Sequence, residues 1–239
     1  MSDEPTLDAA EVSRRIVVGV GLVYDLLNEL NGLLRMTLDG LRSSEMEFEV
    51  IMSKFFRMPV PRGGGRSPAD KSLPLDRGFV LNLGVTGNDE EDEEGEDVED
   101  ADESVSAREK RGLKITPESH FLALRVVLYD RDQAKGGEFV PAVVAATLAN
   151  MKQIPKGKAA QKKKTTTTFQ VTQGRLLQLA KRVSPSVSEG QSLSFRAGGH
   201  ESVCTVTNII SRPLAKFDSE KSVNSFVEEL VQMAEGATT

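Results

Sequence analysis

The chain has 239 residues, a formal net charge of −6 and one cysteine. A single cysteine excludes an internal disulfide and a thiolate-rich metal site. The acidic balance is local, because 12 of the 36 acidic residues lie within residues 89–103 and six lysines lie within residues 152–164. Outside these two tracts acidic and basic residues balance at 24 each. The tracts are therefore opposed appendages of a neutral body.

The N-terminal residues lack the basic-then-apolar order of a signal peptide. The most apolar stretch, residues 16–24, is about half the length that a membrane span needs. We therefore expect a cytoplasmic protein that does not associate with a membrane. The composition fits one folded domain over residues 1–239.

The first predicted element is a long helix over residues 7–41. Its apolar residues alternate at spacings of four and three, which is the seam of a coiled coil. The seam consists of Ile16, Val20, Val23, Leu27, Leu30 and Leu34. An apolar stripe of this width must be covered by the chain's own sheet or by another subunit. We assign these six residues as candidate partner-binding residues.

Three strands are predicted in the next part of the chain. Residues 45–52 alternate charged and apolar side chains, which favours a strand over a continuation of the first helix. Residues 79–85 and 121–129 form two further strands that pair with each other. The connection between them, residues 86–118, carries the acidic tract and is expected to be a disordered insertion.

The C-terminal half is predicted to mix helices and strands. A helix with Pro141 in its first turn presents Val140, Val144, Leu148 and Met151 on one face. Next come a lysine-rich loop over residues 152–164, a strand over 165–172 and a short helix over 176–183. The chain ends with a hairpin around Gly198 and Gly199, over residues 191–211, and a final helix over 218–236 that is capped by Gly236. The fold class is α+β, with the long N-terminal helix packed on a mostly antiparallel sheet.

Catalytic or metal-binding residues are sparse. Asp130 and Asp132 follow a buried strand and could share a divalent cation, but Arg131 would oppose it and a plain turn explains them. Cys204 and His200 lie four residues apart on one strand, about 13 Å from each other, which is beyond hydrogen-bond reach. Cys204 is therefore interpreted as a small buried hydrophobe. We expect no cofactor.

The lysine-rich loop is a candidate phosphate-binding segment. Its residues are Lys156, Lys158, Lys162, Lys163 and Lys164. They would attract a nucleic-acid backbone with a strong dependence on salt. Only Phe169 is nearby to stack on bases, so sequence readout is not supported.

Three functions remain, in order of preference. The first is a non-enzymatic component of a protein assembly, with the N-terminal helix as contact surface, a protein partner or a second copy as occupant, and the charged loops for electrostatic docking. The second is a nucleic-acid-associated protein that uses the lysine-rich loop. The third is a metal-dependent enzyme that uses Asp130 and Asp132.

Overall fold

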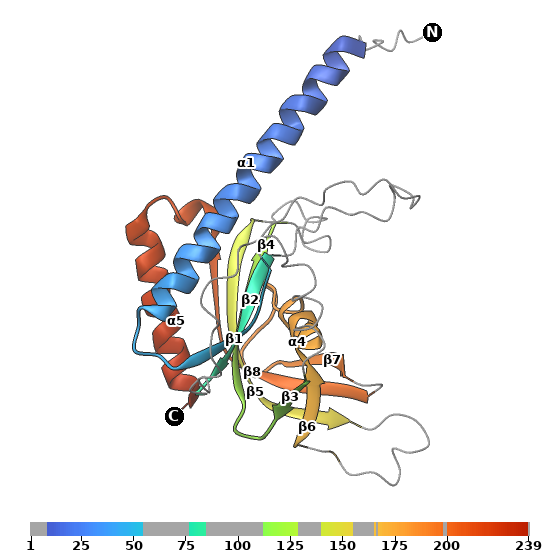
Figure 1. Ribbon diagram of the computed structural model, residues 1–239, viewed down its shortest axis with the longest axis vertical. Coiled ribbons are helices and arrows are strands. Elements are labelled where there is room, and N and C mark those ends of the chain that lie inside the picture. The colour runs from blue at the N-terminus through green and yellow to red at the C-terminus, as the bar shows by residue number, and fades with distance from the viewer. Residues whose placement is uncertain are drawn as a thin grey trace, which may run out of the picture.

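A computed structural model describes residues 9–54, 77–84, 112–128, 140–154, 165, 167–197 and 200–238. Two sheets and three α-helices make up this part of the chain, and Figure 1 shows their arrangement. The helices are α1 (Ala9–Arg42), α4 (Gln173–Ala180) and α5 (Glu220–Thr238). The strands are β1 (Phe48–Lys54), β2 (Arg77–Leu83), β3 (Gly112–Ile115), β4 (His120–Val127), β5 (Ala142–Ile154), β6 (Phe169–Thr172), β7 (Ser192–Ala197) and β8 (His200–Pro213).

The main sheet has six strands in the order β1-β2-β4-β5-β8-β7, and each neighbouring pair is antiparallel. The predicted pairing of the strands around residues 79–85 and 121–129 is confirmed, with Leu81 opposite Leu122. The predicted hairpin is also confirmed as β7 and β8, with Ala197 opposite His200. The α+β class with a mostly antiparallel sheet is therefore correct.

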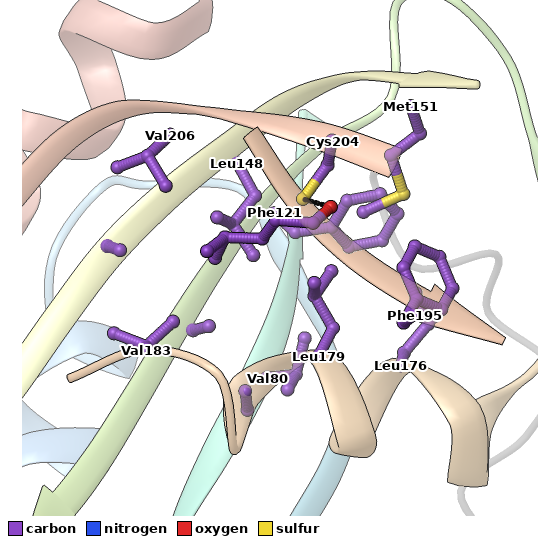
Figure 2. Packing of buried hydrophobic residues seen from close by; sticks show 14 of the residues in the cluster. Val80, Phe121, Leu148, Met151, Leu176, Leu179, Val183, Phe195, Cys204 and Val206 are labelled. Atoms are coloured by element: carbon purple, nitrogen blue, oxygen red, sulfur yellow. Dashed lines mark hydrogen bonds between the residues drawn. The ribbon is translucent and has the colours of Figure 1, made fainter. Parts of the chain in front are cut away.

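The sheet is buried on both faces. On one face α1 and α5 pack over side chains such as Phe79, Leu124 and Val143. On the opposite face α4 and the small β3-β6 sheet cover the alternate side chains of the same strands, such as Phe121 and Val144. Figure 2 shows this second core, with Leu176 and Leu179 of α4 directed toward the sheet. Two covered faces explain why β2 and β4 are apolar almost without interruption.

The segment predicted as a helix after Pro141 is strand β5, so that prediction was wrong. Its spacing placed Val144 and Leu148 on one helical face, yet Val143 and Ala145 are equally buried on the other face of the sheet. A run that is apolar at every position is compatible with either structure, and here both sheet faces are covered. The β-branched residues of this run fit a strand better than a helix.

A bulge bends β5 near its end. The pairing with β8 shifts between Ala149 and Lys152, and Asn150 between them has a positive φ of 53°. Asparagine tolerates this left-handed conformation better than most residues, and such bulges increase the local twist of a strand. Beyond the bulge, Leu193 and Phe195 of β7 belong to the core on the α4 face of the sheet, and Phe195 is labelled in Figure 2.

Helix α5 is fixed to the sheet by Arg212 of β8. Its guanidinium bonds to the Ser222 carbonyl at 3.1 Å and to the Glu229 carboxylate. It also lies over the rings of Phe217 and Phe226, at 5.8 and 5.2 Å from their centroids. Helix α5 continues through Gly236 to Thr238, so the predicted glycine cap was wrong.

Two other differences concern the charged tracts. Strand β3 lies inside residues 86–118, which were expected to be an insertion, and pairs with β6. Lys152, the first lysine of the expected loop, belongs to β5 and pairs with Val203. The acidic tract and residues 155–164 lie outside the described residues.

Candidate functional site: the projecting half of α1

Helix α1 divides into two halves with different surroundings. Its C-terminal half packs against the sheet and α5, and Leu27, Leu30 and Leu34 are each no more than 3% exposed. Its N-terminal half extends beyond the sheet and α5, as Figure 1 shows. The helix is therefore anchored at one end by the hydrophobic core and unsupported at the other.

The contact between α1 and α5 is close at Gly40. A Cβ atom at this position would lie 2.9 Å from a methyl carbon of Val227. Glycine therefore lets the two helices approach each other here. Gly19, Gly21 and Gly32 differ, because a Cβ atom built at any of them has no neighbour within 4 Å.

The N-terminal half presents apolar side chains to solvent. Val17 is 71% exposed, Val18 is 56% exposed and Leu22 is 66% exposed. Val23 and Leu26 are also exposed, at 38% and 40%. Single exposed apolar residues are normal on a protein surface, but five within ten positions form a continuous patch. Such patches mark sites of contact with another protein or a membrane.

The structure divides the six residues of the predicted seam. Leu27, Leu30 and Leu34 are core residues of this chain, so the intact fold does not offer them to a partner. Val23 is partly exposed. Ile16 and Val20 belong to α1, but their side chains lie outside the described residues. Among the side chains that the structure describes in this half of α1, Val23 is the exposed residue of the seam, and Val17, Val18, Leu22 and Leu26 are exposed residues outside the seam.

No family model, no curated protein and no solved structure matches this chain. The assignment of the site therefore depends on its physical chemistry alone.

Length and composition also make α1 a candidate for crossing a membrane. Residues Ser13–Arg42, near the N-terminus, form a helix that is long and apolar enough to cross a membrane, although core helices of soluble proteins can be as long and as apolar. Asp25 and Glu29 lie within this stretch, and Leu27, Leu30 and Leu34 are buried in the chain's own core, but only 13% of the most apolar 18-residue window is buried. The exposed apolar side chains that the structure describes here run from Val17 to Leu26, about 13 Å of helix, which is less than half of a bilayer core.

The other predicted sites have different outcomes. Asp130 and Asp132 lie outside the described residues, and so do the five lysines of the phosphate-binding prediction. Within the described part of the chain there is no cluster of three or more His, Cys, Asp or Glu residues that could hold a metal ion. Metal and phosphate binding therefore stay predictions from the sequence.

Cys204 is a core residue, as its sequence context indicated. It is 1% exposed on β8, and its Sγ lies 3.8 Å from the Leu193 carbonyl oxygen, the contact drawn in Figure 2. Burial raises the pKa of the Cys204 thiol to about 12, while the hydrogen bond to Leu193 acts in the opposite direction. A thiol with this pKa has almost no thiolate at neutral pH and is a poor nucleophile.

We expect native Cys204 to react with a water-soluble thiol reagent only when the fold opens. Its pKa in the fold, about 12, exceeds the ordinary value of 9.0, so below pH 9 the neutral thiol predominates in both states. Between these values the unfolded chain loses the proton first, and stability falls as pH rises. Denaturation of the wild type and of Cys204→Ala at about pH 8 and about pH 10 measures this difference. Equally fast labelling of the native and denatured protein would contradict burial.

Proposed function

We propose that this protein is a non-enzymatic component of a protein assembly and that the N-terminal half of α1 is its contact surface. One observation supports the proposal most strongly: Val17, Val18 and Leu22 are more than half exposed on a helix that the core already fixes in place. An anchored helix loses little conformational entropy when it binds, which favours association. Burial of one such side chain contributes about 1.5–3 kcal/mol.

The proposal gives the two charged tracts an accessory part. Residues 89–103 and 152–164 carry opposite charge and would steer the approach of a partner rather than provide affinity. This part of the proposal depends on electrostatics, so raising the ionic strength should slow association.

A photo-crosslinking residue at Leu22 should form covalent adducts with protein in the native cell. The matched position is Ser225, which is exposed on α5, away from the α1 patch. We expect protein adducts from position 22 and few from position 225, measured by mass shift after irradiation. Adducts with lipid only, or equal adducts from both positions, would contradict a protein-contact role for α1.

A further inference from the structure

A second stripe on α1 uses the same alternating spacing as the buried seam but faces solvent. Its members lie four and three residues apart, so they share one side of the helix. They are Glu11, Arg15, Val18, Leu22, Asp25 and Glu29. We call this set the outward stripe. It lies on the side of the helix opposite Leu27, Leu30 and Leu34, which face the core.

The outward stripe has an apolar centre between two charged ends. Val18 and Leu22 form the centre, at 56% and 66% exposure. Arg15 lies on one side of this centre and Asp25 on the other, each three residues away. The four central residues of the stripe are therefore a cation, two apolar residues and an anion. When a second copy of these four residues runs in the opposite direction, each cation meets an anion and each apolar residue meets an apolar residue.

The complementarity selects an antiparallel arrangement. If two copies of α1 cross about a two-fold axis near residue 20, Val18 of each copy faces Leu22 of the other. Arg15 of each copy then faces Asp25 of the other, which gives two equivalent ion pairs. A parallel arrangement would instead place Arg15 against Arg15 and Asp25 against Asp25, and like charges at such positions are unfavourable.

The ends of the stripe are compatible with this alignment. Glu11 would face Glu29, but the Glu11 carboxylate already accepts hydrogen bonds from Arg14 and Arg15 of its own helix, at 2.7 and 2.8 Å. Arg14 lies outside the outward stripe and stays paired with Glu11 in the dimer, whereas Arg15 is shared between Glu11 and Asp25 of the second copy. The contact from residue 11 to residue 29 is about 27 Å long at the rise of an α-helix.

On the basis of the proposed function, we propose that the occupant of this surface is a second copy of this chain, bound antiparallel through the outward stripe. The core packs on α1 mainly at its C-terminal half, and α5 reaches the stripe side of the helix only near Gly40, eleven residues beyond the last residue of the stripe. The contact is isologous and closes as a dimer. A lipid surface fits the stripe less well, because Asp25 and Glu29 would enter the apolar phase with Leu22.

Reversal of one charge should weaken the dimer, and reversal of both should restore it. In Arg15→Glu, two acidic residues face each other twice, and in Asp25→Arg two basic residues do. We expect each single variant to raise the dissociation constant about tenfold, and the double variant to return to within about threefold of the wild type. An equal mixture of the two single variants should form a heterodimer, because both cross-pairs are then attractive. Analytical ultracentrifugation of the full chain over a range of concentrations measures all four cases.

Arg42→Glu and Asp39→Arg are the matched controls. They reverse the same charges on the same helix, at exposed residues 3.6 Å apart that lie outside the outward stripe. Both controls should dimerise as the wild type does. Circular dichroism of every variant checks that α1 remains folded.

The possible results separate this inference from the proposed function. A wild-type chain that stays monomeric at all concentrations would overturn the second copy as occupant. Protein adducts at position 22 in the cell would then still support an assembly role with a different partner. A dimer that ignores both charge reversals would overturn the antiparallel alignment. A monomer that binds vesicles of neutral and anionic phospholipid would overturn the inference in favour of a membrane surface.

Discussion

Replacing Leu34 with alanine should lower the free energy of unfolding by about 3 kcal/mol. Leu34 is fully buried between the sheet and α5, in the middle of the anchored half of α1. The substitution removes three carbon atoms and leaves a cavity that the surrounding side chains of both layers fill only in part. Chemical denaturation monitored by circular dichroism measures the change.

The matched variant is Leu22→Ala, on the same helix but in the projecting half. Leu22 is 66% exposed, so its truncation should change the stability of the monomer by no more than about 0.5 kcal/mol. Denaturation should be performed at low protein concentration, because association would stabilise the fold by mass action. Leu34→Met, which conserves side-chain volume, should recover most of the lost stability. Equal effects of Leu34→Ala and Leu22→Ala would contradict the division of α1 into two halves.

This division shows how far the sequence could predict the site. The seam from Ile16 to Leu34 predicted that one side of the helix must be covered, and Leu27, Leu30 and Leu34 are covered. Periodicity does not say what covers it, because a leucine packs as well on the chain's own sheet as on another subunit. The core of this chain covers Leu27, Leu30 and Leu34.

The outward stripe was detectable in the sequence but was not selected. Val18 and Leu22 have the same four-and-three spacing as the seam, but their neighbours on the stripe are charged. A search for the most apolar stripe therefore passes over them. Their exposure becomes informative only when the structure shows that Leu27, Leu30 and Leu34 of the seam are buried in the core of this chain.

Most strands could be predicted where one face alternated or where a turn signal was strong. The strand around residues 48–54 and the hairpin around Gly198 and Gly199 are examples. Strand β5 was not recognised because its apolar run has no alternation and Pro141 just before it is also typical of the first turn of a helix. Strand β3 has only four residues, and its partner β6 lies more than fifty residues later in the chain. Short strands with distant partners leave little local signal.

Gly78→Ala should be among the most destabilising single substitutions in the sheet, at about 3 kcal/mol. Gly78 lies in β2 opposite Arg125 of β4. A Cβ atom at this position would lie 2.0 Å from the carbonyl oxygen of Leu124, and the nearest atoms are backbone rather than flexible side chain. The two strands would have to separate locally, with loss of ladder hydrogen bonds between the start of β2 and the end of β4.

Gly32→Ala is the control for this prediction because it has the same chemical change without the contact. Nothing lies within 4 Å of a Cβ atom at position 32, and helix α1 gains about 1 kcal/mol from alanine in place of glycine. The two substitutions should therefore shift the midpoint of thermal unfolding in opposite directions. A stable Gly78→Ala variant would mean that β2 and β4 can move apart at this point without cost. The close approach of the two backbones would then not hold β2 and β4 together.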